Sequence, residues 1–171
     1  MKYYLFWLLA FLFVLGCKTD NETYEINPNL PQLRADWERE YAAWQALDIQ
    51  NYQFNFARPE TYGDNWHVTI TVKNGNCYSA VDWKGYQYDD SFKFTINEYF
   101  MKISNTFDMI ENGPEDPDVI YVSIEIRYDP EYHFPAYISH VRVYKKSLGG
   151  VGGNGSEDVI KNFAILEEST T

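Results

Sequence analysis

The side chains best suited to acid–base or nucleophilic chemistry are three histidines, His67, His133 and His140. No two of them stand four residues apart, the spacing that places two histidines on one helix face, and no HExxH-type element is present. A catalytic set built from Ser79 or Cys77 with one of these histidines stays open as an alternative. Cys77 lies in an apolar, strand-like segment, which favours a buried and unreactive thiol. We therefore expect a protein that is not an enzyme, with a hydrolase as the less favoured alternative.

Acidic residues gather in two predicted loops. One loop contains Asp89 and Asp90, and the other contains Glu115, Asp116 and Asp118. Carboxylate oxygens are the ligands that Ca²⁺ prefers in proteins. Neither loop has the regularly spaced ligands and the central glycine of an EF-hand, so solvated loop charge is the favoured interpretation. We predict no bound metal and no cofactor, while calcium binding by these loops stays open.

A third group of candidate residues is aromatic. Five rings fall in predicted loops or at the ends of predicted strands: Tyr62, Trp66, Trp83, Tyr86 and Tyr88. Aromatic side chains in exposed loops offer a large contact area at a low entropic cost, and they often bind sugars or proteins. The alternative is that these rings cap the core of the sheet. The five residues are predicted as candidate ligand contacts.

The N-terminus is typical of a signal peptide. Lys2 is followed by an apolar run of 13 residues, from Tyr3 to Leu15. A helix of this length rises about 20 Å, whereas the hydrocarbon core of a bilayer is about 30 Å thick. The run is therefore short for a membrane span and has the length of the apolar region of a signal peptide.

The end of this run, residues 14–17 (VLGC), resembles the lipobox of bacterial lipoproteins. The resemblance implies that residues 1–16 are removed and that the thiol of Cys17 receives diacylglycerol, which would anchor the chain to a bilayer. Lys18 differs from the aspartate that typically retains such proteins in the inner membrane. We therefore expect a lipid-anchored protein of the bacterial cell envelope, in the outer membrane and on its periplasmic or surface face. An ordinary signal peptide, or a signal anchor with an incidental cysteine, is the alternative.

The composition fits one small domain behind this leader. The chain has 171 residues, of which 45% are hydrophobic and 18% aromatic, so it can form a core and is not a disordered chain. The formal net charge of −11 argues against nucleic acid as a partner, because phosphate binding needs clustered Lys and Arg. Polar composition predicts a flexible tether over residues 17–30, and a single α+β domain is expected over residues 31–171.

Hydrophobic periodicity predicts two helices. The first follows Pro31 and has an apolar face consisting of Leu33, Trp37, Tyr41, Trp44 and Leu47. The second covers about residues 96–110, after a capping-box pattern of Thr95 and Glu98. Its apolar face consists of Ile96, Phe100, Ile103, Phe107 and Ile110. Apolar residues three and four apart favour amphipathic helices whose stripes pack in the core.

Other segments alternate with a period of two, as strands do. Strands are predicted over residues 52–56, 68–72, 77–83, 119–128 and 137–143, and over 159–166, where a short helix is the alternative. Asn74-Gly75 predicts a hairpin turn, and residues 149–155 predict a flexible glycine-rich loop. In the third strand one face should contain Cys77, Ser79, Val81 and Trp83, and in the fourth Ile120, Val122, Ile124 and Ile126. This order predicts an α+β fold with an antiparallel sheet of five to six strands (meander, helix, hairpin) backed by two helices.

Short motifs add a resemblance. They are residues 49–54 (IQNYQF), 72–75 (VKNG), 95–103 at the start of the second helix, 128–130 (YDP), 134–135 (FP) and 160–163 (IKNF). Together they resemble a bacterial lipoprotein family known as domain-of-unknown-function family six-one-seven-four, over about residues 37–166. Members often have a cysteine pair just after the first strand, where this chain has FARP at residues 56–59, so any role of that pair does not transfer. The resemblance implies a fold and a location but no activity.

We therefore expect a lipid-anchored envelope protein that is a non-enzymatic binding or interaction module. A glycan-binding module that uses the Tyr/Trp loop is the first alternative, and a periplasmic hydrolase is the second. The expected partners are the membrane, through the lipid on Cys17, and an unknown envelope protein or glycan, but not nucleic acid.

Overall fold

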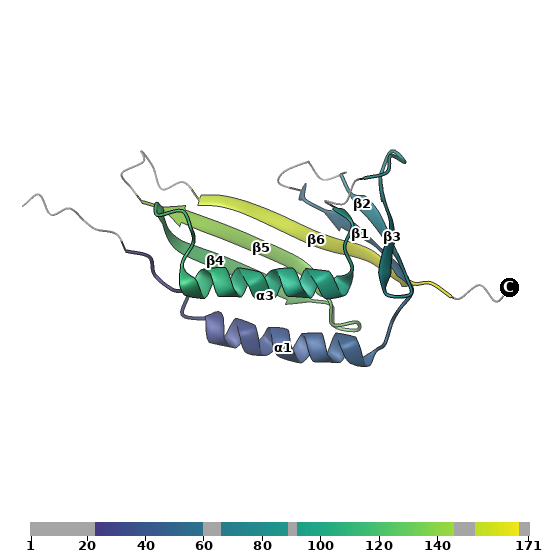
Figure 1. Ribbon diagram of the computed structural model, residues 1–171, viewed down its shortest axis with the longest axis horizontal. Helices are drawn as coiled ribbons and strands as arrows, with labels where there is room; N and C mark the ends of the chain where they lie inside the picture. The colour runs from purple at the N-terminus through teal and green to yellow at the C-terminus, as the bar shows by residue number, and fades with distance from the viewer. Residues whose placement is uncertain (1–22, 60–65, 89–91, 146–152, 168–171) are drawn as a thin grey trace, which may run out of the picture.

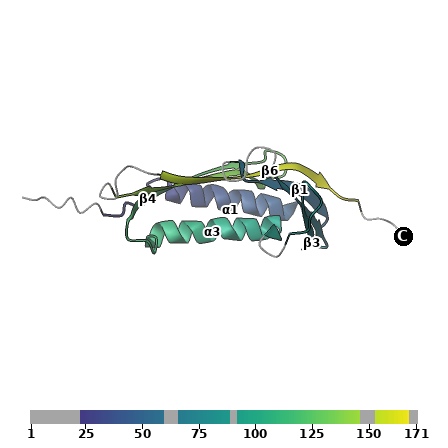
Figure 2. The same ribbon diagram turned by 90° about the horizontal axis from the view of Figure 1, so that it is seen from above.

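Two described helices lie on one face of a six-stranded antiparallel sheet (Figure 1, Figure 2). The computed structural model describes residues 23–59, 66–88, 92–145 and 153–167. The helices are α1 (Leu30–Ala46) and α3 (Ile96–Asn112), and the strands are β1 (Tyr52–Ala57), β2 (Val68–Lys73), β3 (Asn76–Asp82), β4 (Val119–Tyr128), β5 (Pro135–Tyr144) and β6 (Gly153–Ile165). The strand order is β3-β2-β1-β6-β5-β4, which confirms the predicted fold class.

β6 joins the two parts of the sheet. β1, β2 and β3 form the predicted antiparallel meander, and β4 and β5 form the predicted hairpin. The turn between β2 and β3 has positive φ at Asn74 and Gly75, as the sequence predicts. β6 pairs antiparallel with β1 on one side and with β5 on the other. The first and last strands are therefore neighbours, and the sheet continues beneath both helices (Figure 1).

β6 also begins earlier than predicted. The alternation of residue types indicates a closing strand from Val159, with a glycine-rich loop over residues 149–155. Residues 153–155 of that loop instead pair with residues 141–143 of β5, and residues 149–152 lie outside the described residues. Because glycine has no side chain, a glycine-rich segment shows no alternation of apolar and polar residues. Its backbone can still form hydrogen bonds with a neighbouring strand.

Irregular pairing changes which residues of β3 face the helices. Cys77 pairs with Val72 and Ser79 pairs with Thr71, with a register shift between the two pairs. Such a shift reverses the side-chain alternation, and the buried residue of this strand is Ala80. This overturns the predicted common face of Cys77, Ser79, Val81 and Trp83.

β4 and α1 each depart from their predicted apolar face at one end. The pairing of β4 with β5 shifts between Val119 and Tyr121, so Val119 is buried and Ile120 is partly exposed. Ile120 therefore does not continue the buried row of Val122 and Ile124. Leu47 is exposed because α1 ends at Ala46, one residue before it.

α3 supplies the centre of the core. All five residues of its predicted apolar face are buried: Ile96, Phe100, Ile103, Phe107 and Ile110. The predicted capping box closes its N-terminus, since the Glu98 amide donates to Thr95 Oγ1 at 3.1 Å and the Thr95 amide donates to Glu98 Oε2 at 2.6 Å. Trp37, Tyr41 and Trp44 of α1 pack against this core. The aromatic stripe of the first helix is therefore core, as predicted.

The end of the predicted tether packs against the domain. The Tyr24 hydroxyl donates to the carbonyl of Ile110 at 2.7 Å, and the Glu25 amide donates to the carbonyl of Ile120 at 2.8 Å. Asn27 is buried. These contacts place residues 23–29 on the folded domain rather than in a free tether. The predicted signal peptide and Cys17 lie outside the described residues.

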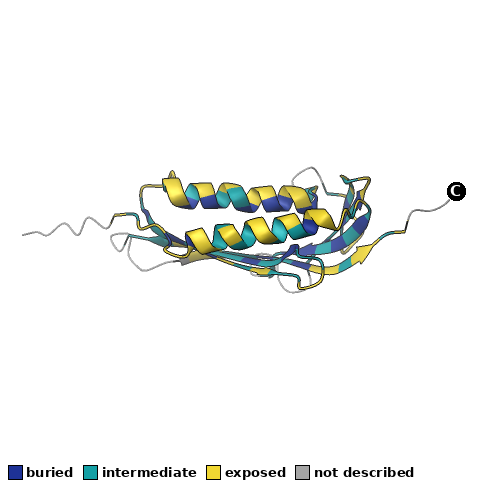
Figure 3. Ribbon diagram, turned by 90° about the horizontal axis from the view of Figure 1, so that it is seen from below, coloured by how far each residue is buried: buried dark blue, intermediate teal, exposed yellow. Residues whose placement is uncertain are grey.

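The sheet face opposite α1 and α3 carries no described helix (Figure 3). Its side chains are mostly polar: the Tyr137 hydroxyl donates to Glu157 at 2.6 Å, and the Arg127 guanidinium lies 3.7 Å from the centre of the Tyr137 ring. Lys161 of β6 lies on this face as well. In the described part of the chain no helix is both long and apolar enough to span a bilayer.

Candidate functional site

The turn after β3 displays two of the predicted aromatic contacts. Asp82 fixes this turn, because its Oδ1 accepts the amides of Lys84 and Tyr86, each at 2.8 Å. The Asp82 amide also donates to the Tyr86 carbonyl at 2.9 Å, and Gly85 provides the positive φ that the turn needs. On this fixed backbone Trp83 is 51% exposed and Tyr86 is 70% exposed. We call residues 82–86 the aromatic turn.

Two other predicted contacts belong to the packed end of the sheet. The rings of Trp66 and Tyr88 pack on Phe92, with centroid distances of 5.4 and 4.8 Å. Trp66 Nε1 also donates to the Tyr88 hydroxyl at 3.3 Å. Both residues are therefore core-capping, the alternative that the sequence left open. Tyr62 lies outside the described residues.

Tyr78 is an exposed ring that the sequence analysis did not single out. It stands at the register shift of β3, and the Lys73 amine lies 4.1 Å from the centre of its ring. A cation over an aromatic face contributes a modest attraction at exposed sites. Lys84 is placed similarly over Trp83, at 4.7 Å. Two of the exposed rings of β3 and its turn, Tyr78 and Trp83, therefore lie beside lysines, a pairing that strand periodicity does not encode.

The residues considered for nucleophilic chemistry have structural partners. Cys77 lies 3.8 Å from the carbonyl oxygen of Ser79, and burial raises the pKa of its thiol. A thiolate is the nucleophilic form, so a raised pKa disfavours reactivity near neutral pH. Nδ1 of His133 lies 2.8 Å from a Glu40 carboxylate oxygen, which ties the β4–β5 turn to α1.

The acidic loop before β4 is held by its own contacts. Asp116 accepts the amide of Asp118 at 3.0 Å, and the Asp118 carboxylate lies 3.8 Å from the Lys145 amine. Asp89 and Asp90 lie outside the described residues. Within residues 23–59, 66–88, 92–145 and 153–167, no three His, Cys, Asp or Glu side chains are arranged to hold a metal ion.

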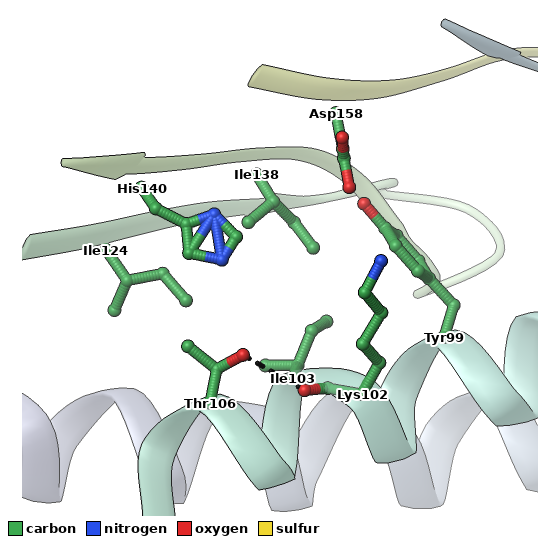
Figure 4. A pocket seen from close by; sticks show the side chains of 8 residues that line it. All are labelled: Tyr99, Lys102, Ile103, Thr106, Ile124, Ile138, His140 and Asp158. Carbon is green, nitrogen blue, oxygen red and sulfur yellow. Dashed lines mark hydrogen bonds between the residues drawn. The ribbon is translucent and has the colours of Figure 1, made fainter. Parts of the chain in front are cut away.

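A small cavity lies between α3 and the sheet (Figure 4). Its volume is about 10 Å³, close to the room that a single water molecule needs. Isoleucines form part of its wall, and its polar lining comes from three elements. The lining residues are Tyr99, Lys102, Ile103, Thr106, Ile124, Ile138, His140 and Asp158.

Helix and strand periodicities bring the polar residues of this cavity together. Tyr99, Lys102 and Thr106 are three and four residues apart, so they lie on one face of α3. His140 and Asp158 lie on the sheet face that α3 covers, on β5 and β6. Figure 4 shows the Lys102 amine reaching from the helix toward the sheet, and the Tyr99 hydroxyl pointing at the Asp158 carboxylate.

An ion pair closes one side of the cavity. Arg58 Nε lies 2.7 Å from Asp158 Oδ1, and Arg58 Nη2 lies 3.4 Å from Oδ2. The Asp158 side chain is only 6% exposed. The Tyr99 hydroxyl is buried and has no hydrogen-bond partner among the described residues. Burial, together with the Asp158 charge, raises the pKa of Tyr99, so the hydroxyl keeps its proton.

The two basic groups on the open side of the cavity titrate below their ordinary ranges. Burial lowers the pKa of the Lys102 amine, an effect that Asp158 opposes. Burial also lowers the pKa of His140, with a further lowering by Arg142, Lys102 and Arg58 and an opposing effect of Asp158. The His140 ring is therefore neutral at pH 7, with one nitrogen able to donate and the other able to accept.

A separate, shallow groove lies along the sheet beside this cavity. His140 lines both, and the groove has a volume of about 280 Å³. Its other lining residues are Arg142 and Tyr144 of β5 and Asn154, Gly155 and Ser156 of β6. The sequence offered His140 as a candidate base for Ser79 or Cys77, not as the neighbour of these residues. It missed Lys102, Asp158 and Arg142, because each has the appearance of an ordinary surface charge in its own segment.

The lowered pKa of His140 predicts a loss of stability in mild acid. The unfolded chain, with an ordinary histidine pKa of about 6.5, takes up a proton before the folded chain does, so stability is lost as pH falls below that value. We expect His140→Gln to remove this contribution. Urea midpoints at pH 7.5, 6.5 and 5.5 should therefore fall less steeply in the variant than in the unchanged protein. Equal slopes would contradict a buried neutral His140.

Comparison with known proteins identifies one family. A family model with the description "Family of unknown function (DUF6174)" matches residues 36–142. The matched region runs from α1 into β5, so it leaves out β6 and the IKNF motif at residues 160–163. No curated protein and no solved structure matches the chain.

Proposed function

This chain belongs to the DUF6174 family of unknown function, and from that premise we propose that it is a lipid-anchored envelope protein that binds a partner protein through the aromatic turn. The single observation that supports this role best is the exposure of Trp83 and Tyr86 on a backbone fixed by Asp82. Large exposed rings on a fixed turn lose little freedom on binding, so contact with a partner gains most of their burial energy.

The position of the turn in the molecule suits this role. Residues 23–29 pack beside Ile110 and Ile120 at one end of the long axis, and the aromatic turn lies at the other end (Figure 1). Six residues lead from Cys17 to Thr23, and an extended chain of that length spans at most about 20 Å. With a lipid on Cys17, the first end would stay near the membrane and the turn would face away from it.

A protein partner suits the turn better than a glycan does. Sugar rings stack on an open aromatic face, whereas the Lys84 amine lies over the Trp83 ring at 4.7 Å. Lysine beside exposed aromatic rings instead offers both apolar contact and charge, as the centre and rim of a protein interface do. A glycan partner is therefore a separate outcome of the experiment below.

Site-specific photo-crosslinking in intact cells tests the contact role. A photo-reactive phenylalanine analogue at position 86 is expected to give discrete protein adducts. The same analogue at position 161, on the sheet face that carries no described helix, should not give them. Trp83→Ala in the position-86 protein should reduce the adducts about tenfold, the loss typical of an interface anchor. Identical adducts at both positions, no adducts at all, or adducts to saccharide only, would contradict a protein-contact role for the turn.

Lipid attachment is tested separately. Cys17→Ser is expected to move the protein from the membrane fraction to the soluble fraction and to leave the signal peptide uncleaved or differently cleaved. Membrane fractionation and the mass of the purified protein measure both effects. Normal maturation and unchanged sedimentation with membranes in the Ser variant would rule out the lipid anchor while leaving the contact role of the turn intact.

A further inference from the structure

We propose that the cavity beneath α3 and the groove that shares His140 with it together bind a small organic anion, with a carboxylate or phosphate oxygen at the cavity and the rest of the molecule in the groove. This site is separate from the aromatic turn. It consists of Tyr99 and Lys102 of α3, His140 and Arg142 of β5, and the polar residues of β6 beside them.

The charge of this site is opposite to that of the molecule. The whole chain has a formal net charge of −11. In the site, Arg58 pairs with Asp158. Lys102 and Arg142 are exposed residues without an ion pair within 4 Å in the described part of the chain, and Arg142 also lines a neighbouring pocket with Glu115 and Asp116. Lys102 and Arg142 thus bring positive charge to one concave surface of an acidic protein. Such a surface favours anions and focuses their approach.

The Tyr99 hydroxyl provides a second, independent observation. It is buried and lines the cavity, and it makes no hydrogen bond of good geometry to a described residue, although the Asp158 carboxylate is close enough to raise its pKa. A buried hydroxyl without a partner is costly and uncommon in folded proteins. The hydroxyl points at the Asp158 carboxylate, which also accepts from Arg58. An oxygen placed in the cavity would accept from the Tyr99 hydroxyl and from the Lys102 amine together.

The dimensions of the site limit its ligand. The cavity has room for one water-sized atom, which a single carboxylate or phosphate oxygen matches. The groove offers a larger volume, and there Arg142 provides a planar guanidinium that pairs well with carboxylates and phosphates. Asn154 and Ser156 add uncharged polar groups along the same wall. A compact molecule with one acidic group at its end satisfies all of these features.

The neutral His140 between cavity and groove predicts a proton linkage. An anion bound beside this ring would favour its protonated form. Binding of acetate, which stays ionised in this range, should therefore take up protons and strengthen as the pH is lowered from 7.5 to 6.0. His140→Gln should remove that pH dependence. The other charged groups that act on the ring are Arg58, Lys102, Arg142 and Asp158.

Titration of the full-length protein in detergent with inorganic phosphate, and separately with acetate, tests the site. Binding is followed by backbone amide chemical shifts at constant ionic strength, with chloride as the balancing anion. We expect saturable shifts in α3, β5 and β6 with at least one of the two probes. Lys102→Gln and Arg142→Gln should each weaken binding about tenfold, the usual effect of losing one charge-assisted hydrogen bond.

Matched variants separate the site from general charge effects. Lys161→Gln removes a positive charge from the opposite face of the same sheet, and it should leave binding unchanged. Tyr99→Phe should weaken binding while keeping the fold. Saturation by phosphate alone would assign a phosphate ester as the ligand class, and saturation by acetate alone a carboxylic acid. No saturable response to either probe, or an equal loss in the Lys161 variant, would overturn the anion site.

Discussion

Trp44→Ala is expected to lower the free energy of unfolding by about 3–5 kcal/mol, the range for removing a large aromatic side chain from a core. Trp44 is 3% exposed. Its ring meets those of Tyr52, Phe163 and Phe134 edge-on, at centroid distances of 5.6, 5.9 and 6.3 Å. Its Nε1 also donates to Asn97 Oδ1 at 2.9 Å, which links α1 to the first turn of α3. The substitution therefore leaves a cavity between the helices and the sheet.

Urea unfolding followed by far-ultraviolet circular dichroism measures this loss, since that signal does not depend on tryptophan fluorescence. Trp83→Ala is the matched control. It removes the same side chain from an exposed turn, so we expect it to change the free energy of unfolding by less than about 1 kcal/mol. Similar losses in the two variants would contradict the assignment of Trp44 to the core and Trp83 to the surface.

Arg58→Met is expected to cost about 3 kcal/mol of stability. The substitution leaves the Asp158 carboxylate buried without the guanidinium that now lies 2.7 Å away, and breaking a buried ion pair on one side typically costs about 3–5 kcal/mol. Arg58 itself is 29% exposed, and the nearby Lys102 amine compensates part of the lost charge. Both facts place the expected value at the low end of the range.

A second substitution distinguishes the buried charge from a simple loss of packing. Arg58→Met combined with Asp158→Leu removes both charges, and its stability should return to within about 1 kcal/mol of the unchanged protein. Arg39→Met is the surface control. Arg39 is 63% exposed and pairs with Asp36 and Glu40, and exposed pairs contribute little. If the double variant were as unstable as the single one, the loss would not come from leaving the Asp158 carboxylate buried without a partner.

Several elements follow directly from local sequence. The capping box at Thr95 and Glu98, the apolar stripe of α3 and the Asn74-Gly75 turn all appear as predicted. Each of these patterns is read from residues within a few positions of one another. The structure that they specify is equally local, because a helix repeats every 3.6 residues and a two-residue turn involves its immediate neighbours.

Register shifts and strand neighbours were not predictable in this way. The residue types of β3 do not predict the register shift between Cys77 and Ser79. This shift exchanges the two faces of the strand. The position of β6 between β1 and β5 depends on pairing between strands about a hundred residues apart in the chain. Alternation of apolar and polar residues indicates that a segment is a strand. It does not indicate which strand lies next to it, because the backbone hydrogen-bonding groups are the same in every antiparallel strand.

The candidate site residues show the same difference between local sequence and tertiary contacts. Trp83 and Tyr86 were predicted as exposed contacts and are exposed, whereas Trp66 and Tyr88 have the same residue types and pack on Phe92. Only the folded chain separates the two pairs, because exposure depends on what lies opposite a ring. Arg58 and Asp158 are 100 residues apart, and neither is distinctive in its own segment.

The amino-acid sequence alone therefore determined which segments become helices, strands and turns, apart from the start of β6, and which residues of the helices form the core, apart from Leu47. Tertiary structure decided which strands are neighbours, which aromatic rings stay in solvent, and which charges meet beneath α3. The physical reason is one of range. Periodicity and capping act between residues a few positions apart. Burial and charge pairing depend on surfaces that come together only when β6 joins β1 to β5 in one sheet.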